Sequence, residues 1–170
     1  MTYVIGYALF MSPDAIARTI GDKELIVARL DGYKRVFNLR PSRWQIYPSA
    51  KNEYKAIANV KVESNHSINC VIFDVDVDEL EMLKIRSKSY NTKKVNVTLK
   101  DKRKVEALLL IGKKKLHGED IIDDDFLPIP EYLTKCLNAA KAFGDRFYEE
   151  WLNTTFTGSG VSFREYIKTI

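Results

Sequence analysis

The stretch from Tyr3 to Pro13 constrains the fold of this chain most, because it predicts a strand that passes almost directly into a helix. Residues 3–7 are mostly apolar and β-prone, which is typical of a buried strand. Ser12 suits a helix N-cap and Pro13 the first helical position, so we expect a helix that ends near Gly21. Such a junction directs backbone N–H groups toward a small concave site for a carboxylate or a phosphate, although an ordinary core can begin in the same way.

The composition indicates a single globular domain. The chain has 170 residues, of which 45% are apolar and 29% charged. The sequence shows neither an apolar run of about 18 residues nor a signal peptide, so we expect no membrane span and a cytoplasmic location. The net charge of +4 is mild and does not by itself indicate nucleic acid as a partner. Cys70 and Cys136 lie in apolar surroundings, which predicts buried thiols in a reducing compartment, not a disulfide.

Hydrophobic patterns predict the remaining elements. Residues 25–39 are β-prone, with Asp31-Gly32 between the two halves as either a tight turn or a bulge in one continuing strand. A helical apolar face runs from Pro130 to Trp151, with a break near Gly144. The other expected elements are strands at 68–75, 95–99 and 105–111, helices at 77–83 and 161–170, an aromatic loop at 40–55, a charged loop at 112–125 and a flexible break at 154–160. The aromatic loop either walls a pocket or packs on the core.

Several short motifs occur in an order and spacing that resemble one known family. They are Tyr7-Ala8-Leu9 after the first strand, the segment Leu30–Asn38, Ala58-Asn59-Val60, the helix containing Leu80 and Leu83, and the helix of Pro130, Tyr132 and Trp151. Together they resemble the gamma-glutamylcyclotransferase superfamily, which includes the ChaC-like and AIG2-like proteins. The resemblance implies an α+β fold, a small mixed β-barrel with flanking helices and a ligand cavity at one end. It implies one domain over residues 1–170, with 151–170 as a C-terminal extension.

The resemblance also implies a reaction. In this family the α-amine of a γ-glutamyl group attacks its own γ-carbonyl and releases 5-oxoproline, an acyl transfer that makes the active members transferases. A carboxylate removes the proton from the amine, and backbone N–H groups of the first loop hold the oxyanion. The reaction implied needs no metal and no cofactor.

This sequence departs from the family at the site of that reaction. Relatives carry the base as a Glu just after the Leu-x-x-Leu helix, where this chain has Ser87, and here Ala8 and Leu9 replace the family's Gly and Ser. A Ser without a His partner does not accept a proton at the pKa that a carboxylate supplies. We therefore predict a pseudoenzyme that keeps the cavity without the usual turnover. The alternative is an active cyclotransferase with a relocated acid, taken from Glu53, Asp74, Asp76, Glu79, Glu81 and Glu106, with Glu81 and Glu106 as the leading substitutes.

The segment from Lys84 to Lys104 is strongly basic, with nine Lys and Arg residues and a single acid, Asp101. Cations at a cavity mouth favour an anionic small molecule, either a γ-glutamyl compound or a phosphate- or nucleotide-like anion. The segment is alternatively a solvated surface, or a face that binds a protein or a polyanion. The residues expected to bind or border the ligand are Gly6, Tyr7, Ala8, Leu9, Phe10, Lys84, Arg86, Ser87, Lys88 and Tyr90. The oligomeric state stays open.

Overall fold

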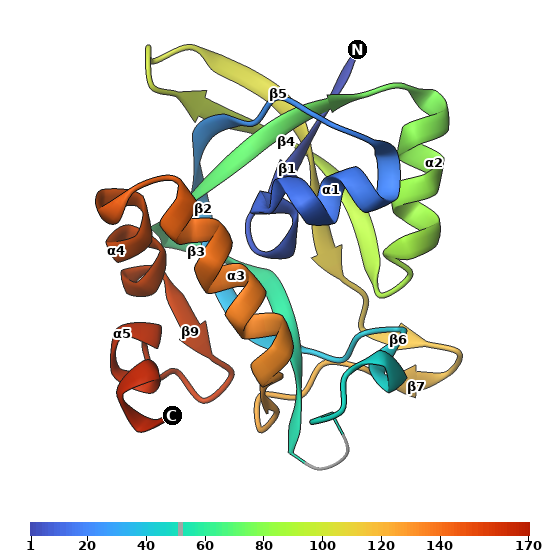
Figure 1. The fold of residues 1–170 in the computed structure, drawn as a ribbon, viewed down its shortest axis with the longest axis vertical. Helices are drawn as coiled ribbons and strands as arrows, with labels where there is room; N and C mark the ends of the chain where they lie inside the picture. The colour runs from blue at the N-terminus through green and yellow to red at the C-terminus, as the bar shows by residue number, and fades with distance from the viewer. Residues whose placement is uncertain (51–52) are drawn as a thin grey trace.

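The computed structural model describes residues 1–50 and 53–170, and a closed β-barrel lies at its centre (Figure 1). The barrel strands are β1 (Thr2–Gly6), β2 (Ile26–Leu39), β3 (Tyr54–Val75), β4 (Tyr90–Leu99) and β5 (Lys104–Gly112). β1 pairs antiparallel with β3 and parallel with β5, and antiparallel pairings then connect β5 to β4 and β4 to β2. Antiparallel pairing of β2 with β3 closes the ring, which confirms the predicted mixed barrel.

β2 and β3 form the longest ladder of the barrel. β2 has 14 residues and β3 has 22, and they pair along most of their length. The register shifts between Asp31 and Tyr33, where Gly32 takes a φ of 86°. The Asp31-Gly32 pair is therefore an irregularity in one continuing strand and not a tight turn, because only glycine enters this conformation at little cost.

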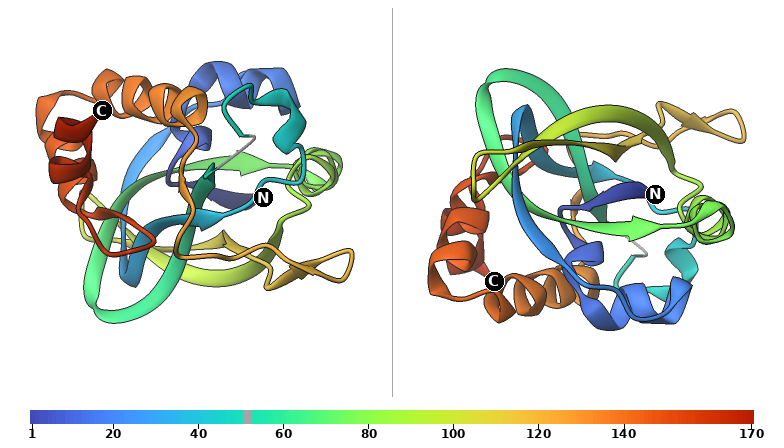
Figure 2. Two further views of the ribbon diagram at one scale, coloured as in Figure 1. Left: turned by 90° about the horizontal axis from the view of Figure 1, so that it is seen from below. Right: turned by 90° about the horizontal axis from the view of Figure 1, so that it is seen from above.

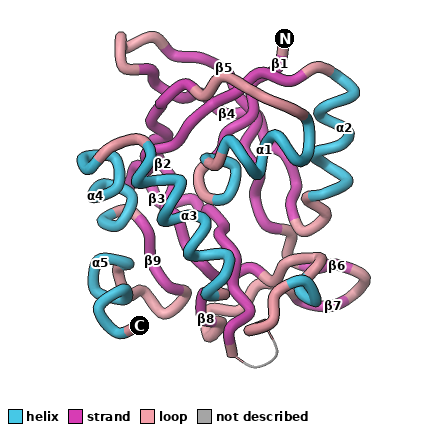
Figure 3. Tube along the Cα trace, in the orientation of Figure 1, coloured by secondary structure: helices cyan, strands magenta, loops and turns pink. Residues whose placement is uncertain are grey.

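Helices surround the barrel, as Figures 2 and 3 show. They are α1 (Pro13–Ile20), α2 (Val77–Arg86), α3 (Pro130–Ala142), α4 (Asp145–Asn153) and α5 (Phe163–Tyr166), with short 3₁₀ turns at Leu9–Met11, Trp44–Ile46 and Ile167–Thr169. The side chain of Ser12 accepts a hydrogen bond from the Ala15 N–H at 3.3 Å, which confirms the predicted N-cap. The predicted break between α3 and α4 is also confirmed, since Gly144 has a φ of 103° there.

Two predicted loops are wrong, because each contains strand pairing that local sequence patterns do not reveal. The charged loop at 112–125 contains a hairpin of β6 (Lys115–Leu116) and β7 (Glu119–Asp120). The break at 154–160 contains β9 (Thr155–Thr157), which runs parallel to β2, and the helix expected at 161–170 shortens to α5 and a 3₁₀ turn. A further short strand, β8 (Leu127–Pro128), lies beside β3.

The core lies between the barrel wall and α3, α4 and α5. Phe37, Trp151 and Phe163 are fully buried, so the last twenty residues contribute side chains to the same core as the barrel. Cys70 and Cys136 are buried free thiols, as predicted, and burial raises the pKa of Cys70 to about 12. Among the helices of the described chain, none is both long and apolar enough to cross a membrane.

Candidate functional site

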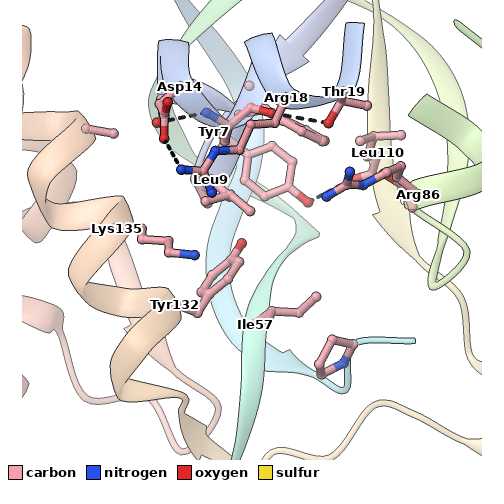
Figure 4. Close-up of a pocket in the computed structure, with 18 of the residues that line it drawn as sticks. Tyr7, Leu9, Asp14, Arg18, Thr19, Ile57, Arg86, Leu110, Tyr132 and Lys135 are labelled. Carbon is pink, nitrogen blue, oxygen red and sulfur yellow. Dashed lines mark hydrogen bonds and ion pairs between the residues drawn. The ribbon is translucent and has the colours of Figure 1, made fainter. Parts of the chain in front are cut away.

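A cavity of about 670 Å³ opens beside the C-terminal end of β1 (Figure 4). Its walls come from the loop after β1, from α1, from the loop after β2, from the end of α2 and from α3, with Ile57 of β3 and Leu110 of β5 deeper inside. The volume falls within the range of small-molecule sites, roughly 300–1,000 Å³. Elements far apart in the sequence therefore meet around one space.

The loop after β1 is fixed from two sides. A Cβ on Gly6 would collide with the Phe10 carbonyl oxygen, so glycine is needed where the chain folds back. The Tyr7 hydroxyl donates a hydrogen bond to the Leu110 carbonyl at 2.7 Å. The Trp151 indole Nε1 donates to the Tyr7 carbonyl at 3.1 Å, which ties the loop to α4. These contacts hold the wall of the cavity in place without a ligand.

The structure places most of the sequence-predicted binding residues in the cavity lining. Those in the lining are Gly6, Tyr7, Ala8, Leu9, Phe10, Arg86, Ser87 and Tyr90. Lys84 and Lys88 lie outside it and are exposed, and Lys84 is 3.8 Å from the Glu81 carboxylate on the same helix. Of the three cations expected to set the potential at the mouth, Arg86 is thus the one in the lining.

Ser87, which the sequence resemblance aligns with the family Glu, lines the cavity at the C-cap of α2. It is buried, and its backbone N–H donates to the Lys84 carbonyl at 3.2 Å. No histidine occurs in the described lining: His66 lies 6.1 Å from the Phe156 ring centroid, and His117 is exposed in the β6–β7 hairpin. Ser87 therefore has no side-chain base beside it to make it a nucleophile.

Asp14 is the one carboxylate in the described lining of the cavity. It lies in the first turn of α1 and pairs with Arg18 at 3.1 Å, with the two side chains 76% and 70% exposed. The leading substitute acids lie elsewhere, because both Glu81 and Glu106 are exposed and outside the lining. The other candidate acids Glu53, Asp74, Asp76 and Glu79 are also outside it. The sequence contained a signal for Asp14, since it follows the N-cap of the helix expected to border the site.

Four cations line the mouth, and three of them were not predicted. Arg18 comes from α1, Arg43 from the loop after β2, Arg86 from the end of α2 and Lys135 from α3. Figure 4 shows Arg86 and Lys135 on opposite sides, both directed toward the open space. Within the described residues, Arg43, Arg86 and Lys135 have no ion-pair partner. Their positive charge is available to a ligand.

Among the described residues, four tyrosines line the cavity: Tyr7, Tyr47, Tyr90 and Tyr132. Burial raises the pKa of Tyr7, Tyr90 and Tyr132 well above the usual value, and it raises the pKa of Tyr47 to about 12. The four phenols therefore stay protonated at neutral pH and cannot act as bases there. The described residues contain no group of three or more His, Cys, Asp or Glu side chains that could hold a metal ion.

Comparisons with known proteins bear on the fold. No protein-family model and no curated protein matches this sequence. A solved structure named gamma-glutamyl cyclotransferase has a TM-score of 0.67 at 17% identity, over 99% of each chain. An uncharacterized protein from Homo sapiens has a TM-score of 0.68 at 16% identity, over 88% of this chain and 85% of that one. A gamma-glutamyl cyclotransferase from yeast, described as specific to glutathione, has a TM-score of 0.60 at 14% identity, over 90% of this chain and 94% of the yeast chain.

The chain therefore has the gamma-glutamylcyclotransferase-like fold, as the sequence resemblance implies. At these identities the likeness concerns the fold, and the chemistry of the cavity depends on its own residues.

Proposed function

We propose that the cavity binds a small anionic ligand and that the protein lacks the 5-oxoproline-forming turnover of gamma-glutamylcyclotransferases. The observation that carries this proposal is the charge of the lining: its described residues include four cations and one carboxylate, Asp14, which is already paired with Arg18. Cations gathered at the mouth of a concave site raise the local concentration of anions and give them charge-assisted hydrogen bonds.

The proposed loss of turnover is supported by the buried residues of the lining, which form the floor of the cavity. The described residues of this floor include no base. Cyclisation of a γ-glutamyl group begins with removal of a proton from its α-ammonium, which calls for a carboxylate within hydrogen-bond reach. At the position that the sequence resemblance assigns to the family Glu, the chain has Ser87, which is a residue of the lining. The neighbouring phenols stay protonated because burial raises their pKa values. The floor therefore offers donors and apolar surface in place of a proton acceptor.

A search for product tests the loss of turnover. The protein is incubated with γ-glutamyl-alanine and with glutathione, and 5-oxoproline is measured by mass spectrometry against a protein-free control. We expect no rate above the control. Product at enzyme-like rates that disappears in Asp14→Asn would overturn the proposal and favour a relocated acid at the mouth. The variants Glu81→Gln and Glu106→Gln test the two acids that lie outside the lining.

Charge reversal tests the anion site, with phenyl phosphate as the probe in a calorimetric titration. Arg86→Glu and Lys135→Glu are expected to weaken binding by about ten-fold or more, because each replaces an attractive charge in the lining with a repulsive one. Lys84→Glu and Lys88→Glu make the same change in net charge outside the lining, and we expect an effect of about two-fold or less. Equal losses in all four variants would contradict binding in the cavity.

A polyanion-binding face is the second candidate, and one observation favours it. The β4–β5 hairpin exposes five lysines, Lys93, Lys94, Lys100, Lys102 and Lys104, and two acids, of which Asp101 is paired with Arg103 at 2.7 Å and Glu106 is exposed. Binding of inorganic polyphosphate that falls steeply with salt and is unaffected by Lys135→Glu would favour this function over the cavity.

A further inference from the structure

The charged and the uncharged residues of the cavity lining lie at different depths. Every charged residue of the lining is exposed, namely Asp14, Arg18, Arg43, Arg86 and Lys135. Every buried residue of the lining is uncharged, including Ile5, Ile57, Leu110 and Ala139. A ligand that enters therefore meets charge first and an uncharged floor afterwards.

Three hydroxyls on the floor donate their hydrogens within the protein. The Tyr90 hydroxyl donates to the Ala58 carbonyl at 2.6 Å, and the Ser89 hydroxyl donates to the Arg40 carbonyl at 3.0 Å. The Tyr7 hydroxyl is likewise committed to the Leu110 carbonyl. An amino acid head group placed here would give up its hydration and find no carboxylate for its ammonium group. The floor thus disfavours a zwitterion.

The floor does fit an apolar body. In Figure 4, Ile57 lies below the Tyr7 ring and beside Tyr132, and Leu110 lies to the right of Tyr7; both are buried residues of the lining. Ring edges and faces pack well against other rings, and aliphatic side chains gain from removing apolar surface from water. A cavity of about 670 Å³ is far larger than an inorganic anion needs, so there is room for an organic group.

We propose that the ligand is an amphipathic organic anion, whose uncharged aromatic or apolar body lies on the tyrosine floor and whose anionic group lies outermost, between Arg86 and Lys135. This inference rests on the proposed function and adds the class and the orientation of the ligand. The guanidinium of Arg86 suits a phosphate or sulfonate in two-point contact, and the Lys135 ammonium provides a point charge from the opposite wall.

A panel of four probes tests the inference on the unmodified protein by calorimetry. Phenyl phosphate carries both the ring and the anion, inorganic phosphate the anion alone, phenol the ring alone, and O-phosphoethanolamine the anion on a cationic body. We expect the Kd of phenyl phosphate to be lower than that of each of the other three probes by about ten-fold or more. Only phenyl phosphate has both a ring that packs on the floor and an anion that pairs with the cations at the mouth.

Three substitutions on α3, one of them a control, sharpen the test. Ala139→Leu fills part of the floor and is expected to weaken phenyl phosphate by about ten-fold while leaving inorganic phosphate within about two-fold. Lys135→Ala should weaken both phosphates to a similar degree, whereas Lys141→Ala, on the same helix but outside the lining, should change neither. A circular-dichroism melt of each variant checks that the fold is retained.

The outcomes separate this inference from the proposed function. If inorganic phosphate or O-phosphoethanolamine binds as tightly as phenyl phosphate, the apolar body contributes nothing and the inference fails, while anion binding stands. If phenol binds as tightly, the anion contributes nothing and both fail. If none of the probes binds at millimolar concentration, the proposed function fails as well.

Discussion

Two regions of the molecule hold positive charge in contrasting surroundings, a closed region around Arg35 and the cavity. In the closed region beneath α4, Arg35 is 0% exposed, and its guanidinium lies 5.1 Å from the Trp151 ring. Its Nη1 donates to the Thr154 and Thr155 hydroxyls at 2.9 and 3.0 Å, and its Nη2 donates to the carbonyl and side-chain oxygens of Asn69. In the cavity, by contrast, every cation stays at the exposed rim.

The difference separates a structural role from a binding role. Burial lowers the pKa of Arg35 to about 10, so the guanidinium is still charged at neutral pH and depends on a fixed set of uncharged oxygens. Those oxygens come from β3, α4's C-cap and β9, so the charge joins three parts of the chain. At the mouth of the cavity, Arg43, Arg86 and Lys135 have no ion-pair partner among the described residues, which leaves these three free to exchange water for a ligand.

The largest effect is expected from breaking the closed region at Trp151. Trp151→Ala should reduce the free energy of unfolding by about 3–5 kcal/mol, because it leaves a large void and uncovers Arg35. The same substitution at Trp44, a partly buried residue in the loop beside the cavity, should cost about 1 kcal/mol. Urea titration measures both. Similar losses of unfolding free energy at the two positions would contradict the structural role of the closed region.

Replacing Arg by Lys in each region compares the two regions directly, with a smaller expected loss of stability than Trp151→Ala. Arg35→Lys should cost about 2–3 kcal/mol, because an ammonium cannot span the Asn69 and threonine oxygens or stack on the indole. Arg86→Lys makes the identical change at the rim and should alter stability by no more than about 0.5 kcal/mol. Chemical denaturation of the two variants beside the parent protein gives the difference directly. A small cost at Arg35 would mean that its hydrogen bonds are replaceable.

Much of the fold could be predicted because its signals are local or lie in ordered motifs. The Ser12 cap and the Gly144 break follow from short-range chemistry, whereas at Gly32 the sequence left a turn and a bulge open and the pairing of β2 with β3 decides between them. The closure of the barrel does not follow from short-range chemistry, since β4 meets β2 through only two residue pairs, Ala28 with Leu99 and Arg29 with Thr98. Such pairings depend on long-range packing, which periodicity does not encode.

The site was partly predictable for the same reason. The loop after β1 and Ser87 were found through motif positions. Lys135 was not found, because it lies on α3, 80 residues after the aromatic loop at 40–55 and 31 residues after the basic segment that ends at Lys104. Lys84 and Arg86 were grouped by composition. Successive residues of a helix are about 100° apart, so side chains two residues apart point to nearly opposite sides. Helical geometry therefore explains why Arg86 lines the cavity and Lys84 does not.

Alkaline pH tests whether the cavity floor needs to stay uncharged. Burial raises the folded-state pKa of Tyr132 well above the unfolded value of about 10, so the unfolded chain loses this proton first as pH rises. The stability contribution is complete below about pH 10 and is lost above it, by about 1.4 kcal/mol for such a tyrosine at pH 11. Tyr132→Phe should therefore decline less than the parent protein between pH 8 and pH 11 in urea titrations. If both proteins lost the same unfolding free energy over this pH range, Tyr132 would not be a buried neutral phenol in the folded state.

The smallest change in stability is expected from removing the rim's carboxylate. Asp14→Asn breaks an exposed ion pair and takes an acid from the first turn of α1, which together should cost less than about 1 kcal/mol. The same change releases Arg18 and removes a repulsive charge from the mouth, so affinity for phenyl phosphate should rise by about two- to five-fold. At the rim we therefore expect stability to fall while affinity for phenyl phosphate rises. A substitution in the closed region is expected to lower both stability and affinity. A ten-fold loss of affinity in Asp14→Asn would instead mean that Asp14 contacts a cationic group of the ligand, and the ligand would then be a zwitterion.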